Sequence, residues 1–234
     1  GGTVAESGEL NNTRFSGALR VGPDLVVASL ASAPAASGAG GSVTLTDTTR
    51  NTGTAPSGAS VTGFYFSSNA VLDAADPLLG SRAVPGLGPG QSSAGATPVQ
   101  IPQTAGTGTY YIFAKADVGA TVVESTETNN ASPALAIRLG PDLTLTALTA
   151  PTAAAAGSSI VVNDTTANTG GGSAPGSTTR FHLSVNLALD AGDVVLGSRA
   201  IPALAAGTSS AGSTTVVIPP GTAPGTYWLI AVAD

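Results

Sequence analysis

Two pairs of aspartates are the residues in this sequence whose spacing is most suited to chemistry. Asp73 and Asp76 lie in "NAVLDAADP", and Asp190 and Asp193 repeat them in "NLALDAGDV". Hard cations such as Ca²⁺ take several oxygen ligands at about 2.3–2.6 Å, and carboxylates supply such oxygens. Aspartate also initiates turns and caps them through backbone hydrogen bonds. The pattern allows a calcium loop or a capped turn, and it favours the turn because the spacing is not that of an EF-hand.

The histidine and cysteine content argues against catalysis. His182 is the one histidine, position 65 of the other copy carries tyrosine, and there is no cysteine. Because Phe181 and Leu183 flank His182, alternation along a strand would turn its imidazole away from the core. No serine stands in a nucleophile turn with an orienting partner. The residues therefore predict no enzymatic activity, and they exclude disulfides and thiolate metal sites.

An internal repeat of more than one hundred residues organises the chain. The segment "GPDLVVASL" at 22–30 returns as "GPDLTLTAL" at 140–148. Likewise, "DTTRNTG" at 47–53 returns as "DTTANTG" at 164–170. The sequence therefore predicts two modules of the same fold.

The repeat also predicts where the modules begin and end. The segment "GGTVAESGELNN" at 1–12 matches "GATVVESTETNN" at 119–130, which closes the first repeat. We therefore expect residues 1–21 to be the closing strand of a preceding module. Residues 22–139 would then form a complete module, and residues 140–234 a second module that lacks its closing strand. Residues 1–21 would complete such a module in an adjacent copy, either by covalent continuation or by strand exchange; continuation is favoured because joining the two ends gives "VADGGTVAES".

The acidic and amide residues of the closing motif have two possible roles. Side chains of this kind fix the entry to a hairpin or bind a cation, and we favour the hairpin role. The residues are Glu124, Glu127, Asn129 and Asn130, with counterparts Glu6, Glu9, Asn11 and Asn12.

The composition fits an all-β protein. Hydrophobic residues make up 42% of the chain, whereas 31 glycines and 16 prolines interrupt it with turns. Short alternating stretches such as "SVTLTDTT" and "TGFYFSS" predict strands, and about seven strands per repeat are typical of an immunoglobulin-like antiparallel β-sandwich. The net charge is −6 and the arginines do not cluster, so no basic face for nucleic acid can form. No apolar run is long enough for a membrane span.

One aspartate per repeat falls on the inward face of a strand. Strict alternation places Asp47 with Val43 and Leu45, and Asp164 takes the same position in the second repeat. A buried carboxylate is costly unless it is paired or hydrogen-bonded. We expect both aspartates at the end of their module, bonded to backbone N–H groups or to an arginine such as Arg82 or Arg199.

The strand that follows "GT" in each repeat predicts a contact face. If its alanines face the core, its aromatic and branched residues face outward, where a neighbouring strand adds two more rings. Such a patch indicates contact with another subunit, with tryptophan as its anchor, unless a loop of the same module covers it. The predicted contact face comprises Tyr65, Tyr111, Phe113, His182, Trp228, Ile230 and Val232.

Four motifs together resemble the CARDB family, a cell-adhesion-related module of bacterial and archaeal surface proteins. They are "PDL", "NTG", "FYFSSN" followed by "LDAADPLLGS", and "VVESTETNN". The resemblance covers essentially the whole chain. It implies an immunoglobulin-like sandwich used in tandem outside the cell, with no reaction and no defined ligand.

The function that these observations predict is structural or adhesive. We expect an extracellular, cell-surface fibre or filament, built by other copies of the chain in a head-to-tail array. The alternative is a carbohydrate- or ligand-binding accessory module of a secreted enzyme. Aromatic residues make up only 4% of the chain, which disfavours the flat aromatic platform that such a module would need.

Overall fold

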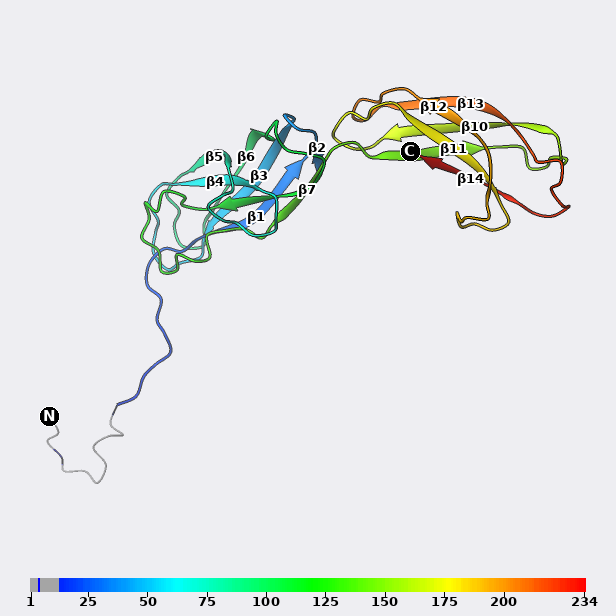
Figure 1. Cartoon of the computed structure of the whole chain (residues 1–234). Coiled ribbons are helices and arrows are strands. Elements are labelled where there is room, and N and C mark those ends of the chain that lie inside the picture. The colour runs from blue at the N-terminus through cyan, green and yellow to red at the C-terminus, as the bar shows by residue number, and fades with distance from the viewer. Residues whose placement is uncertain (1–3, 5–12) are drawn as a thin grey trace.

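The computed structural model describes residue 4 and residues 13–234, and its strands form two successive β-sandwiches (Figure 1). The first module contains β1 (Leu25–Ala33), β2 (Ala36–Ser37), β3 (Ser42–Asn51), β4 (Ser60–Ser67), β5 (Leu78–Val84), β6 (Ser92–Gln100), β7 (Gly108–Lys115) and β8 (Leu135–Leu139). The second contains β9 (Leu143–Thr149), β10 (Ser159–Asn168), β11 (Ser177–Ser184), β12 (Val194–Ile201), β13 (Ser209–Val217) and β14 (Trp228–Ala233). Within this described part no helix is long and apolar enough to cross a membrane.

Each module packs two sheets face to face. In the first module the sheets have the orders β1-β3-β6 and β2-β8-β7-β4-β5, and in the second β13-β10-β9 and β12-β11-β14. The strand pairs are antiparallel apart from β2 and β8, which are parallel. After β1 the chain therefore crosses to the opposite sheet and joins it as β2. This arrangement confirms the prediction of tandem immunoglobulin-like sandwiches.

Alternation along the strands explains the core. In β3, Val43 and Leu45 are buried whereas Thr46 is exposed. The facing sheet contributes Phe64 from β4 and Ile112 from β7, both fully buried. Burying apolar side chains on both inner faces supplies most of the stabilisation of a sandwich.

The two modules differ at one edge. In the first, β7 lies between β4 and β8, and the core forms one continuous cluster. In the second, β14 pairs with β11 and with no other described strand, and the core divides into two smaller clusters. The first module thus contains a closing strand that the described part of the second does not.

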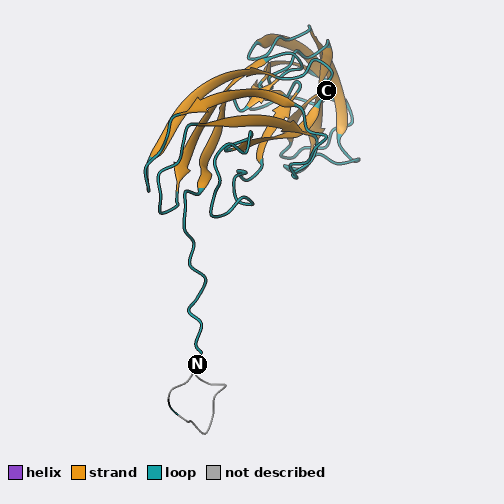
Figure 2. Cartoon of the chain, turned by 90° about the vertical axis from the view of Figure 1, so that its left-hand side faces the viewer, coloured by secondary structure: helices purple, strands orange, loops and turns teal. Residues whose placement is uncertain are grey.

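The N-terminal segment does not belong to either sandwich. Residues 13–21 run outward as an extended chain without strand pairing (Figure 2). Residues 1–3 and 5–12, which carry the first copy of the closing motif, lie outside the described residues. The assignment of residues 1–21 to the closing strand of another module stays a prediction.

Candidate functional site

A buried ion pair joins the two sheets of the first module. Asp47 lies on β3 and Arg82 on β5, which belong to opposite sheets. Arg82 donates from Nε to Oδ1 of Asp47 at 2.9 Å and from Nη2 to Oδ2 at 2.6 Å. It also donates to the hydroxyl and the carbonyl of Ser93. The Asp47 side chain is 0% exposed and that of Arg82 14%, so this bidentate pair is shielded from water.

The second module repeats the ion pair. Arg199 donates from Nε and Nη2 to the two carboxylate oxygens of Asp164, at 2.8 and 2.6 Å. The predicted arginine partners are therefore confirmed. The predicted position at the module end is wrong, because Asp47 lies in mid-strand, opposite Leu30 on β1 and Gly95 on β6. A long guanidinium side chain reaches the middle of the sheet wherever the intervening strand leaves room for it.

A glycine beside each aspartate leaves that room. A Cβ at Gly95 would lie 2.2 Å from Cδ of Arg82, and one at Gly212 would lie 2.8 Å from Cδ of Arg199. These glycines were not predicted from the sequence, although the repeated "SSAG" at 92–95 and 209–212 marks them.

Replacing Gly95 with alanine should destabilise the first module by about 1–3 kcal/mol, because the added methyl group overlaps a guanidinium that five hydrogen bonds hold in place. Chemical denaturation measures the loss. Gly58→Ala is the matched control, since nothing lies within 4 Å of the Cβ that it adds. Equal stabilities for the two variants would contradict a spacing role for Gly95.

The repeated "NTG" motif contains a second buried anchor that the sequence analysis did not assign. The side chain of Asn51 accepts from the N–H groups of Asp24 at 3.1 Å and Gly53 at 3.0 Å. It donates to the carbonyls of Ala55 at 2.8 Å and Leu87 at 2.9 Å. Asn51 is 0% exposed, and its one amide satisfies four backbone groups. It thereby ties the start of β1 to the end of β3 and to the loop before β6.

The acidic loops adopt the capped-turn arrangement. The N–H of Asp73 donates to Asp76 at 2.9 Å, and the N–H of Ala75 donates to Asp73 at 2.7 Å. Asp190 and Asp193 make the same contacts. The N–H of Asp190 and a hydrogen bond with the side chain of Ser184 lower the pKa of Asp193. The turn-capping interpretation is confirmed.

Calcium binding at these loops stays a prediction that thermal denaturation tests. Within residues 13–234 no three histidine, cysteine or acidic side chains gather closely enough to hold a metal. A cation that bound only the folded state would raise the melting temperature. The calcium interpretation therefore expects a rise on adding Ca²⁺ that disappears in Asp73→Asn/Asp190→Asn. If neither Ca²⁺ nor a chelator moves the transition, capping is the whole role of these aspartates.

The closing motif of the first module anchors the segment that leads to β8. Glu124 accepts from the N–H of Leu25 and, at 2.9 Å, from the amide of Asn130. The amide of Asn129 donates to Asp24 at 3.0 Å. The predicted hairpin role is wrong for these contacts, because they bind the segment to the start of β1, which is distant in the sequence.

Glu124 should make the first module more stable as the pH falls towards its raised pKa. Burial raises the pKa of Glu124 above its ordinary 4.5, against the opposing effect of the hydrogen bonds from Leu25 and Asn130. Because the folded state then binds the proton more readily than the unfolded state, stability falls as pH rises through this window. Melting temperatures measured between about pH 4 and 7 test this. Linkage predicts that the melting temperature of the unmodified protein falls as the pH rises, and that Glu124→Gln lacks this contribution. A difference between the two proteins that does not vary with pH would contradict the assignment.

The predicted contact face is partly exposed. On β14, Trp228, Ile230 and Val232 are half-buried, and His182 on β11 lies opposite Ile230. In the first module Tyr65 and Tyr111 are also half-buried. Phe113, by contrast, is only 4% exposed, so its own module covers it. The contact face is therefore more open in the second module than in the first.

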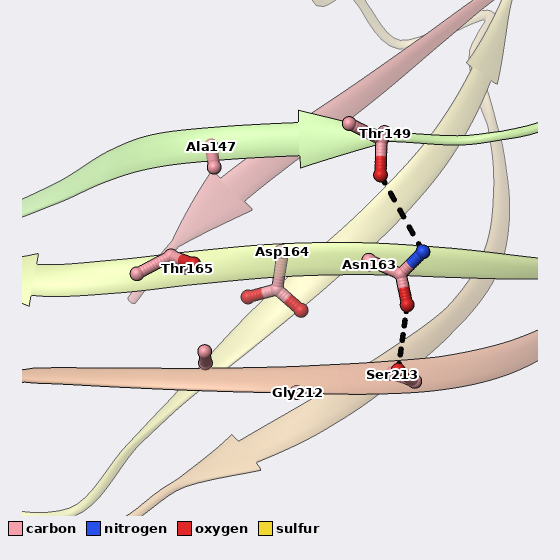
Figure 3. A pocket seen from close by; sticks show the side chains of 8 residues that line it. Ala147, Thr149, Asn163, Asp164, Thr165, Gly212 and Ser213 are labelled. Carbon is pink, nitrogen blue, oxygen red and sulfur yellow. Dashed lines mark hydrogen bonds between the residues drawn. The ribbon is translucent and has the colours of Figure 1, made fainter.

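The outer face of β9, β10 and β13 carries a shallow depression (Figure 3). Asn163 crosses it, donating to Thr149 at 3.4 Å and accepting from Ser213 at 2.6 Å. No aromatic ring lines it, so it offers no stacking surface for a sugar. The lining residues are Ala147, Thr149, Asn163, Asp164, Thr165, Ala211, Gly212 and Ser213.

Asn168 makes the same four contacts in the second module as Asn51 in the first. Two sandwiches in tandem, each with the same buried ion pair and the same asparagine anchor, define an immunoglobulin-like repeat protein. The profile of the CARDB family matches residues 22–134 and 140–234. The chain belongs to the CARDB family, whose domains are tied to cell-surface proteins and adhesion. No curated protein matches it.

Solved structures from several organisms are similar to this chain. A CARDB domain from Pyrococcus furiosus, described in complex with di-metal ions, is 23% identical and covers 54% of this chain and 97% of its own, with a TM-score of 0.39. A domain of a putative cell surface protein from Methanosarcina acetivorans is 19% identical, covering 50% and 91% at a TM-score of 0.37. Red sea bream transglutaminase is 10% identical, covering 93% of this chain but 29% of its own, at a TM-score of 0.46.

Proposed function

We propose that this chain is a non-enzymatic structural or adhesive protein of the cell surface. Its modules pack end to end, and copies of the chain associate head to tail into a fibre or filament through strand complementation. Each module contributes a sandwich locked by an ion pair between its two sheets. The family, whose domains are tied to cell-surface proteins, supports the location.

The joint between the two modules is the observation that carries this proposal. β8 ends at Leu139 and β9 begins at Leu143, so Gly140, Pro141 and Asp142 alone connect them. A Cβ at Gly171 of the second module would lie 2.2 Å from the backbone N of Ser37 in the first. So short a connection, with backbone against backbone, supports modules stacked in a line.

Electron microscopy and sedimentation of the purified chain test the proposal. We expect filaments or multimers whose amount rises with protein concentration. Trp228→Asp should prevent assembly and leave the circular dichroism spectrum unchanged, because it places a charge in the contact face. Val217→Asp is the matched control, since Val217 is 49% exposed on the other sheet. Monomers at every concentration would contradict the proposal, and specific binding to polysaccharide would favour the accessory-module alternative.

A further inference from the structure

The segment that connects the two modules, residues 140–142, is held by both of them. The N–H of Gly140 donates to the carbonyl of Ser37 in the first module at 3.0 Å. The carbonyl of Gly140 accepts from the N–H of Gly172 in the second module at 2.9 Å. Pro141 follows, and its ring fixes its own φ angle. A connection that is hydrogen-bonded on both sides has few backbone angles left to vary.

Asp142, the last residue of this connection, is bound to the second module. Its N–H donates to the side chain of the buried Asn168 at 3.0 Å, and its carbonyl accepts from the N–H of Thr169 at 2.8 Å. The hydroxyl of Thr169 donates to the carboxylate of Asp142 at 3.1 Å. The asparagine anchor of the second module therefore extends into the joint, and the connection does not behave as a flexible linker.

Three glycines bring the backbones of the two modules into direct contact. A Cβ at Gly38 of the first module would lie 3.2 Å from the carbonyl oxygen of Gly171 and 3.2 Å from Cα of Gly172. A Cβ at Gly171 would lie 2.2 Å from the backbone N of Ser37, and one at Gly172 would lie 2.9 Å from Cα of Gly140. None of these three glycines has a positive φ. The neighbouring backbone, and not their own conformation, therefore excludes a side chain at these positions.

The corresponding loop of the first module shows that the loop itself does not need these glycines. Thr54 and Ala55 occupy the positions of Gly171 and Gly172. The carbonyl of Ala55 accepts from the buried asparagine of its module, as the carbonyl of Gly172 does. Thr54 is exposed, whereas Gly171 is half-buried. The requirement for glycine in the second module therefore comes from the contact with the first.

We infer that the two modules form one rigid unit, in which residues 170–173 of the second module dock on residues 37–38 of the first at a fixed angle. Rotation towards this contact drives backbone into backbone. Rotation away from it breaks the hydrogen bonds that join Gly140 to both modules. Such a rigid pair exists in a single chain, so absence of assembly would contradict the proposed function and leave the rigid joint standing.

Distances between two spin labels test the rigidity, because the chain contains no cysteine that would compete for a label. Ala94 on β6 and Ala211 on β13 are exposed, so Ala94→Cys/Ala211→Cys carries one label in each module. Dilution with an excess of unlabelled chain removes distances between copies. We expect one narrow distribution of distances. A broad distribution would show that the modules move independently and would overturn the inference.

A substitution taken from the first module tests whether this contact fixes the angle. Gly171→Thr introduces the residue that stands at position 54, and it should shift or broaden the distance distribution while the circular dichroism spectrum stays unchanged. Gly221→Thr is the matched control, since nothing lies within 4 Å of the Cβ that it adds, and it should leave the distribution as it is.

A second variant approaches the contact from the first module. Gly38→Ala adds a single methyl group against the backbone of residues 171–172 and should shift the distribution in the same way. It keeps the test decisive if Gly171→Thr unfolds the second module. A distance distribution that neither variant changes would overturn the docking of this loop.

Discussion

Replacing Arg82 with methionine should lower the stability of the first module by about 3–5 kcal/mol. The substitution leaves Asp47, whose side chain is 0% exposed, without the partner that neutralises it. The cost is large because the carboxylate has already lost its hydration and no other cation is within reach of it in the described residues. Urea denaturation of the whole chain measures the loss, and Arg199→Met should produce the same effect in the second module.

A double variant separates loss of pairing from loss of packing. In Asp47→Leu/Arg82→Met both charges are removed, so no buried charge remains. Replacing a buried pair with apolar residues of similar volume is often neutral or stabilising. We therefore expect the double variant to recover most of the stability lost in Arg82→Met. If it is as unstable as the single variant, the side chain of Arg82 acts chiefly through packing.

Replacing Asn51 with aspartate should cost the first module about 2–6 kcal/mol, since a buried and a partly buried carbonyl each lose a donor. The nearly isosteric carboxylate keeps the acceptor for Asp24 and Gly53, but it faces the carbonyls of Ala55 and Leu87 with oxygen in place of N–H. Thermal and urea denaturation both measure this loss.

Two controls make the Asn51 result specific. Asn163→Asp makes the same chemical change on the exposed face of β10 and should change stability by less than about 0.5 kcal/mol. Asn168→Asp repeats the buried change in the second module, where the same four contacts exist. Equal stabilities for the Asn51 and Asn163 variants would show that the four hydrogen bonds are dispensable.

The fold class and the tandem arrangement were determined by the sequence itself. Strict alternation in "SVTLTDTT" and its repeat predicts strands with one buried face, and this pattern is local, so it can be read without knowing the fold. The same alternation placed Asp47 inward and therefore required a partner for it. The sequence left open whether that partner is a backbone N–H group or an arginine such as Arg82 or Arg199.

The tertiary structure alone decided where these groups lie. Asp47 and Arg82 are 35 residues apart, and their meeting in mid-sheet depends on Gly95, which lies on a third strand. Asn51 gathers backbone groups from positions as far apart as Asp24 and Leu87, and no local pattern marks such contacts. The burial of Phe113 likewise depends on how its own module folds around it. Periodicity specifies which face of a strand is buried. The atoms that this buried face contacts belong to segments distant in the sequence, and only the assembled sheets bring these segments together.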